Sequence, residues 1–427
     1  MTDPAPLSYR ALLRIPNLGR VLLSMQLARV AQSMVGVAIV LFTLDRYGSA
    51  AFAGLVTFAS VFPGLLISPI AGALLDRHGR IRLVRLDYVV ALASMVVIGV
   101  LALLDALPGP LLVLIAVIAS LTSILSHVGL RSLFPLMVPE PLWERVNAVD
   151  SNGYVVATIV GPPIAAVLVG LLGGATTLLL IGVAFGAAAL VLVGVPDPAG
   201  TIASTGRILS DAWEGMKYTW RNPTLRGLGF AITLGNLAHG MTTIVLPLIV
   251  LQRLGLGVEM VGLVFAASGI SGIASSFLFG RVDSRGREWS MLVWPSLALV
   301  PTVALLLVAA GQSSVPLGLG VLFLEMLLVG LLVGPIDIAL FTVRQRRTEK
   351  AWMGRAFAVS MAFNFLGMPV GAALAGLLAD SSIEAAIVVL GIGGAIASAA
   401  MAAVMVPRTD PARPVSDTMA GGARVEG

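Results

Sequence analysis

Long apolar runs, each of about 20 residues or more, alternate with short polar stretches along the whole chain. A helix rises about 1.5 Å per residue, so about 20 residues cross a bilayer core of about 30 Å. The runs are rich in Leu, Ala and Gly and lack period-2 alternation, which favours helices over barrel strands. The pattern therefore predicts an all-α membrane protein. We expect twelve spans, at 20–44, 51–75, 84–104, 110–134, 148–172, 174–195, 226–251, 258–280, 289–310, 316–341, 356–379 and 384–406.

Composition supports a polytopic membrane protein. Of the 427 residues 58% are hydrophobic and 11% are charged, and a soluble chain of this length would not bury so much apolar surface. The chain has no cysteine, which excludes disulfides and thiolate chemistry. Its three histidines are far apart, and it has neither a Ser-His-Asp arrangement nor a nucleotide loop. We therefore expect no enzyme activity, no cofactor and no metal.

Charge placement predicts the orientation. Lys and Arg concentrate in the two tails and the even-numbered loops, which contain 24 of the 27 basic residues; the exceptions are Arg29, Arg46 and Arg253. Basic loops stay on the cytoplasmic side, so both termini are predicted to be cytoplasmic, in a plasma or inner membrane. The net charge of +5 is spread over many short loops, which favours an anionic membrane surface over nucleic acid as partner.

The chain divides into two halves. We expect a six-helix bundle at 1–195, a linker at 196–225, a second six-helix bundle at 226–406 and a disordered cytoplasmic tail at 407–427. The linker contains SDAWEGMKYTWRNPTLRG, with Trp and Tyr among Lys and Arg, which predicts a helix on the membrane surface.

The two halves repeat each other. GLV at 54–56 recurs at 262–264, DRHGR at 76–80 becomes DSRGR at 283–287, and GPPIAAVLVGLL at 161–172 resembles GMPVGAALAGLL at 367–378. Chance matching of small residues in apolar helices is the alternative, and the repeated Asp-x-x-Gly-Arg, each time on a cytoplasmic turn after an even-numbered span, argues against it. We therefore expect two pseudo-symmetric bundles.

A basic hairpin, GALLDRHGRIRLVRLD, joins the second and third spans. Its glycines permit a tight reversal, and Asp76 can accept hydrogen bonds from the positive end of a neighbouring helix. The pattern Gly72-x-x-x-Asp76-Arg77-x-Gly79-Arg80 resembles the helix 2–3 loop of the major facilitator superfamily of secondary transporters. The resemblance implies a cytoplasmic gate in which Asp76 meets the start of helix 11; a pure topology signal is the alternative. The implied gate residues are Gly72, Asp76, Arg77, Gly79, Arg80, Arg131, Asp283, Gly286, Arg287 and Arg355.

The resemblance extends over nearly the whole chain. LLRIPNLGRVLL, RSLFPLMVPEPLWERVNAVDS, WEGMKYTWRNPTLRGL and MGRAFAVSMAFNFLGMPVGAALAGLLAD are similar to the twelve-helix drug:proton antiporter branch, with its macrolide-efflux, multidrug and enterobactin-exporter-like members. Gly161-Pro162 resembles that branch's helix-5 antiporter motif, although ordinary small-residue packing explains it nearly as well. The chain departs from the branch at Gln32, where relatives carry an acid, and at Leu121–Ser126, which lacks the helix-4 arginine.

Two charged residues are predicted near the middle of spans. Glu325 follows Pro316 by nine residues and Arg29 follows Arg20 by nine, so each lies about 14 Å deep. In this superfamily both helices line the central cavity. Glu325 is the first candidate for the proton-carrying carboxylate, with Arg29 nearby; a structural Glu325–Arg29 ion pair is the alternative.

The implied function is secondary transport by alternating access, most simply proton-coupled export of amphipathic molecules or drugs by a monomer. The alternatives are a dedicated exporter of one metabolite, such as a siderophore or lysolipid, and a sensor that transports nothing. His239 fits either substrate contact or packing. The cavity candidates are Gln26, Gln32, Asn236, His239 and Asn364.

Overall fold

The computed structural model describes residues 9–130, 133–139, 142–197, 208–279, 282, 284, 286–348 and 353–408. These residues form helices and connecting turns, with no strand among them. The helices are α1 (Tyr9–Leu13), α2 (Leu18–Tyr47), α3 (Ala50–His78), α4 (Arg80–Leu103), α5 (Gly109–Gly129), α6 (Phe134–Met137), α7 (Trp143–Leu172), α8 (Gly174–Val191), α9 (Ile208–Arg221), α10 (Pro223–Leu248), the π-helical η3 (Ile249–Arg253), α11 (Val258–Phe279), α12 (Glu288–Ala310), α13 (Val315–Arg346), α14 (Met353–Ala379), α15 (Ile383–Ala386), the π-helical η4 (Ile387–Ile392) and α16 (Gly393–Met405).

Within the described residues, eleven helices are long and apolar enough to cross a membrane. The predicted fifth span corresponds to α7, whose apolar part, Val156–Leu172, is shorter, although the helix itself has 30 residues. The all-α, membrane-spanning prediction is confirmed.

The hairpin between the second and third spans is tighter than the sequence predicts. We expected spans ending near 75 and beginning near 84, but α3 continues to His78 and α4 begins at Arg80. Extending a helix adds one hydrogen bond per residue, so both helices continue past the apolar core. Only Gly79 separates them, and its φ of +92° is a conformation that favours glycine.

The two halves pack alike. In the first half α2 packs on α7 and α8, α3 on α5, and α4 on α5 and α8. In the second half α10 packs on α14 and α16, α11 on α13, and α12 on α13 and α16. When the spanning helices are matched in chain order, each pairing in one half has its counterpart in the other. The structure thus confirms two pseudo-symmetric six-helix bundles.

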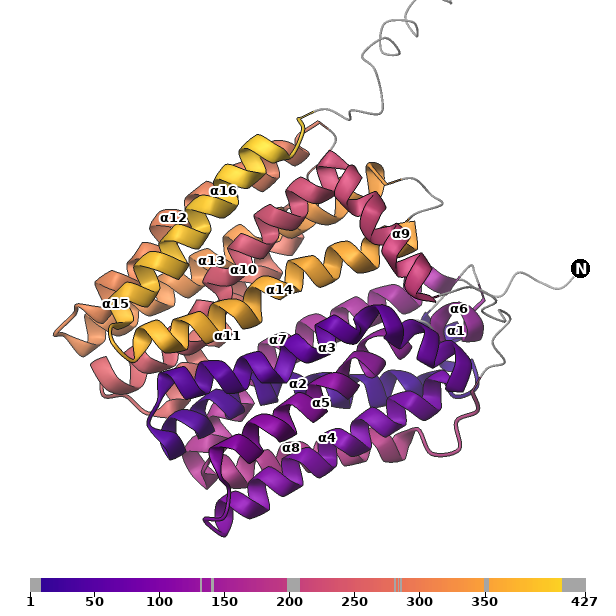
Figure 1. Cartoon of the computed structure of the whole chain (residues 1–427), viewed down its shortest axis with the longest axis horizontal. Helices are drawn as coiled ribbons and strands as arrows, with labels where there is room; N and C mark the ends of the chain where they lie inside the picture. Colours follow the sequence, from indigo (N-terminus) through magenta and orange to yellow (C-terminus); the bar gives the residue numbers. More distant parts are fainter. Residues whose placement is uncertain are drawn as a thin grey trace, which may run out of the picture.

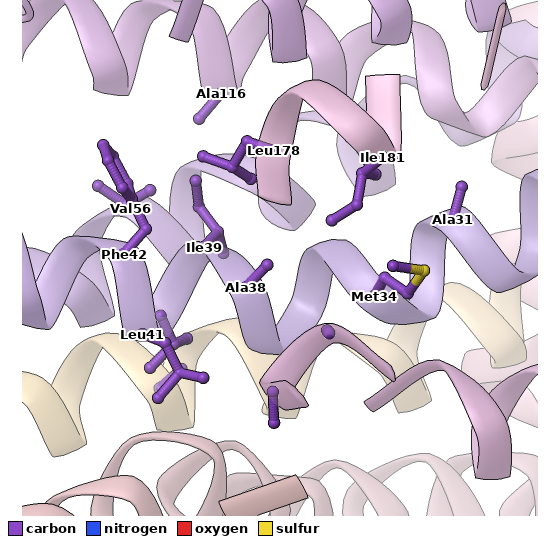
Figure 2. Close-up of a cluster of buried hydrophobic side chains, with 14 of the residues drawn as sticks. Ala31, Met34, Ala38, Ile39, Leu41, Phe42, Val56, Ala116, Leu178 and Ile181 are labelled. Carbon is purple, nitrogen blue, oxygen red and sulfur yellow. The ribbon is translucent and has the colours of Figure 1, made fainter. Parts of the chain in front are cut away.

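The halves contact each other mainly through two helix pairs, α3 with α14 and α7 with α11 (Figure 1). These pairs are also exchanged by the pseudo-symmetry. The core is continuous, and Figure 2 shows part of it around α2, where Ile39 and Met34 lie near Leu178 and Ile181 of α8.

The two ends of the bundle differ in closure. We call the end with Gly79, Arg287 and α9 the basic end, and the end with Ser49, Asp105 and Asp380 the opposite end. Toward the opposite end, α2 is buried on all sides from Ala38 to Thr43, and α10 with η3 from Ile244 to Val250. Toward the basic end α2 is only partly buried, from Gly19 to Val37, whereas α10 is mostly buried from Thr224 to Ala231 and partly buried at 232–237. Both central helices are therefore enclosed at the opposite end, and away from it α2 from Gly19 to Val37 and the middle of α10 are partly accessible.

The linker helix α9 lies across the basic end. It packs on α3 of the first half and on α10 and α14 of the second (Figure 1). Gly215 and Thr219 face the protein, whereas Trp213, Met216 and Trp220 are exposed. The membrane-surface role of this helix stays a prediction.

Candidate functional site

Arg29 of α2 forms an ion pair inside the first half. Its Nη2 lies 2.5 Å from Oδ1 of Asp150 in α7, and its Nη1 donates to the backbone carbonyl of Asp150 at 2.8 Å. The side chains are 14% and 7% exposed. The Arg29 guanidinium also lies 5.9 Å from the centre of the Tyr154 ring. The sequence suggested Glu325 as the carboxylate near Arg29, but the structure pairs Arg29 with Asp150.

A cavity of about 170 Å³ opens beside this ion pair. It lies within the first half, between α2, α4, α5 and α7, and its lining is mixed aromatic, cationic, amide and thioether. The lining includes Met25, Arg29, Gln32, Tyr88, His127 and Tyr154. A lining that combines apolar and polar side chains in similar number suits a small amphipathic ligand.

Asp87, which the sequence analysis did not single out, lies behind this cavity. Its side chain is 4% exposed and lies next to Ser126, Thr122 and His127 of α5. In the sequence, Asp87 is the last residue of the basic hairpin GALLDRHGRIRLVRLD. Because α4 begins already at Arg80, Asp87 instead lies about 10 Å along the helix. Placing the turn at Gly79 would have been enough to predict that Asp87 lies inside the bundle.

Glu325 is fully buried in α13, and neither carboxylate oxygen has a hydrogen-bond partner among the described residues. At about 100° per residue it shares a face with Ile336 and Val343, which pack with residues of α12. It therefore does not face lipid. An ionised carboxylate without partners costs several kcal/mol in such a place, so this position needs a proton or a cation.

A second polar bridge links α10 to α14 in the second half. Asn236 Nδ2 donates to the backbone carbonyl of Asn364 at 2.7 Å. The Asn364 amide, oriented to satisfy both neighbours, accepts from Arg344 Nη2 at 2.6 Å and donates to the Ser360 carbonyl at 3.1 Å. Because α10 and α14 are the pseudo-symmetric counterparts of α2 and α7, this bridge occupies the place that the Arg29–Asp150 ion pair has in the first half. The structure thus brings Asn236 and Asn364 together, but in the second half, away from the cavity beside Arg29.

The remaining cavity candidates are at separate places. Gln26 lies against Gly153 of α7, and Gln32 lines the cavity beside Arg29. His239 lies in α10 and Asp337 in α13, and both residues are exposed.

The structure describes only some of the residues of the predicted cytoplasmic gate. Arg131 and Asp283 lie outside the described residues, and so do the side chains of Asp76, Arg77 and Arg355, although their backbones are helical. Gly72 lies within α3, Arg80 begins α4, Gly286 has a φ of +73° and Arg287 precedes α12. The gating roles stay predictions.

The same turn contains Asp197, which the sequence pattern does not predict to lie there. Asp197, just after α8, accepts from the backbone N–H of Ile81 at 2.7 Å and of Arg82 at 3.2 Å. It thereby caps the first turn of α4. A Cβ on Gly79 would lie 2.5 Å from Asp197 Oδ2, so the glycine is needed for this contact as well as for its φ.

The helix-5 motif packs against α2. A Cβ on Gly161 would lie 2.5 Å from Cβ of Ser33 and 3.2 Å from the backbone nitrogen of Met34. Pro162 and Pro163 lie inside α7, which remains helical through them. This geometry gives Gly161 a packing role, and the antiporter role of the motif stays a prediction.

Comparisons with known proteins agree with this architecture. The model of the family described as "Major Facilitator Superfamily" matches residues 21–368. The chain is 34% identical over 396 residues to "Uncharacterized MFS-type transporter y4rN" of Sinorhizobium fredii, covering 92% of this chain and 96% of that one. It is 27% identical over 380 residues to "Multidrug efflux pump Tap" of Mycolicibacterium fortuitum, covering 85% and 90%. Its fold is similar to a mutant of the nucleoside transporter NupG, with a TM-score of 0.74, 13% identity and coverage of 91% and 99%.

Proposed function

Because the chain belongs to the major facilitator superfamily, we propose that it is a proton-coupled exporter of amphipathic small molecules that works by alternating access. Membership makes it a multi-pass membrane transporter rather than an enzyme. The similarity to a multidrug efflux pump at 27% identity supports export as the direction.

The difference in closure between the two ends supports alternating access. The central helices α2 and α10 are enclosed near the opposite end, whereas α2 from Gly19 to Val37 and α10 at 232–237 are partly exposed. Basic loops favour the cytoplasmic side. On this assignment the structure is an inward-facing state, in which a substrate enters from the cytoplasm or the inner leaflet.

The observation that carries the proton-coupling proposal is the burial of Glu325 without any hydrogen-bond partner. A carboxylate in such a place exchanges a proton when its surroundings change, because the charged form is stable only in contact with water or a cation. Glu325 lies ten residues from the start of α13, about 15 Å from the opposite end. Separation of the halves at that end would bring external water closer to it.

The cavity beside Arg29 supports an amphipathic substrate. Tyr88 and Tyr154 offer ring faces, Met25 offers an adaptable thioether, and Gln32 offers an amide. Its volume of about 170 Å³ suits part of a drug-sized molecule, so the rest of the substrate would occupy the space between the halves.

The test is transport by the purified full-length protein in proteoliposomes. With the basic side outside and that side made alkaline, the protein should accumulate a fluorescent amphipathic dye such as ethidium, and a protonophore should abolish accumulation. Glu325→Gln should lose the dependence on the pH gradient and keep downhill dye movement. Asp337→Asn is the matched control, because Asp337 lies on the same helix but is exposed, and it should remain gradient-driven.

Three outcomes are informative. Unchanged gradient-driven uptake by Glu325→Gln would refute Glu325 as the proton site. If only Asp337→Asn loses the dependence of dye uptake on the pH gradient, Asp337 rather than Glu325 is the proton site. If the wild-type protein moves none of a panel of amphipathic dyes under a pH gradient, proton-coupled export of such compounds is wrong.

A further inference from the structure

The closed end of the bundle contains a polar contact between the halves. Asp380, just after α14, lies beside the first turn of α3. Its Oδ1 accepts from the backbone N–H of Ala50 at 2.8 Å, and its Oδ2 accepts from the Ser49 hydroxyl at 3.1 Å. α14 belongs to the second half and α3 to the first, so these two bonds connect the halves directly.

The contact completes the cap of α3. Ser49 is the N-cap of this helix, and its Oγ accepts from the backbone N–H of Phe52 at 3.1 Å. Four N–H groups at a helix start lack partners within the helix, and Ser49 satisfies one of them. Asp380 supplies the acceptor for another from the other half. Its negative charge also lies at the positive end of α3.

The backbones of the two helices touch next to this contact. A Cβ on Gly376 would lie 3.0 Å from the carbonyl carbon of Ala50 and 3.1 Å from Cα of Ala51. Any rotation that separates the halves at this end must therefore move Asp380 away from the start of α3.

We propose that Asp380 is a latch for the opposite end: its bonds to Ala50 and Ser49 stabilise the state in which that end is closed. When the halves separate there, the Asp380 carboxylate and the Ala50 N–H both become hydrated and the cap is lost. Asp380 is thus a positioning residue for the transport cycle. The inference rests on the proposed alternating access.

The internal repeat shows that this latch exists in one copy. LLAD at 377–380 corresponds to LLGG at 171–174, so the place of Asp380 is taken by Gly174, the first residue of α8. At the α7–α11 contact an acid comes from the other helix instead, since a Cβ on Gly170 would lie 2.7 Å from the carboxyl carbon of Glu259. The α3–α14 contact is therefore the one in which a carboxylate caps the partner helix from the opposite half.

The test measures opening of that end directly. The natural chain has no cysteine, so Ala106→Cys in the first half and Ser313→Cys in the second provide two clean spin-label sites near the opposite end. Distance distributions from pulsed electron paramagnetic resonance would be recorded for the full-length protein in nanodiscs. Asp380→Ala should raise the ratio of the long-distance to the short-distance population by about five-fold, the usual size of a lost cap.

Asp380→Asn keeps an acceptor oxygen but loses the charge, so its shift should be smaller. Asp105→Asn is the matched control, because Asp105 lies at the same end and pairs with Arg46 inside the first half, and it should leave the distances unchanged. Melting temperatures for all variants would separate a shift between states from general unfolding.

An unchanged distance distribution in both Asp380 variants would overturn the latch. So would an equal shift in Asp105→Asn. The readout needs neither substrate nor a proton gradient, so a negative result here is distinct from a failure of transport in proteoliposomes.

Discussion

The Arg29–Asp150 ion pair allows the most exact prediction. Asp150→Asn removes the negative charge and leaves Arg29 in a site where its side chain is only 14% exposed. Breaking a buried pair in this way costs about 3–5 kcal/mol. Because Arg29 keeps its bond to the backbone carbonyl of residue 150, we expect the lower end, about 3 kcal/mol.

Thermal unfolding of the purified protein in detergent measures this cost. For a cooperative unit of about 200 residues, 3 kcal/mol lowers the melting temperature by roughly 6–12 °C. The double variant with Arg29→Gln and Asp150→Asn removes both charges and should recover to within about 1 kcal/mol of the natural protein, since a neutral pair leaves no unpaired charge.

The control is the Arg46–Asp105 pair, whose acid is 92% exposed. Asp105→Asn should cost less than about 1 kcal/mol, because water screens an exposed pair. Two results would contradict the buried pair of Arg29 and Asp150. One is a melting temperature of Asp150→Asn equal to that of the natural protein. The other is a loss of stability in the double variant equal to the sum of the losses in the two single variants.

Two further predictions concern close contacts. Gly79→Ala should lower the melting temperature and reduce transport, because its φ of +92° is strained for alanine and the added Cβ displaces Asp197 from the start of α4; Asp197→Asn, which keeps one acceptor, should cost about 1 kcal/mol or less. If Gly79→Ala matches the natural protein in both assays, this capping geometry is incorrect. Gly161→Leu should abolish folding or transport through its overlap with Ser33, whereas Gly19→Leu, at an open position on α2, should be tolerated; equal behaviour of the two would exclude close α2–α7 packing.

Local features of the sequence were sufficient for the class of fold. Runs of about 20 apolar residues determine spanning helices, because backbone groups in lipid need partners within their own segment. The repeat of GLV and of Asp-x-x-Gly-Arg likewise predicted two matching bundles, which the helix packing confirms. The ends of the helices were less predictable, since α3 and α4 continue through charged residues to a single glycine.

The candidate site was predicted less completely. The depth of Arg29 and Glu325 follows from counting residues along a helix, and both lie in the interior. Their partners do not follow from counting, because a side chain's neighbours depend on which helix faces it and at what rotation. Asp150 and Asp87 therefore emerged only from the packing of α7 on α2 and of α5 on α4.

The sequence by itself determined that this protein is a duplicated bundle of spanning helices with most of its arginines in the loops of one end, because hydropathy and charge act on each segment separately. The tertiary structure alone decided that Arg29 pairs with Asp150, that Glu325 has no partner and that Asp380 meets α3. The two contacts join residues more than 100 positions apart in the sequence, and the isolation of Glu325 depends on which helices surround it. Only the packing of the helices specifies which of these distant groups touch.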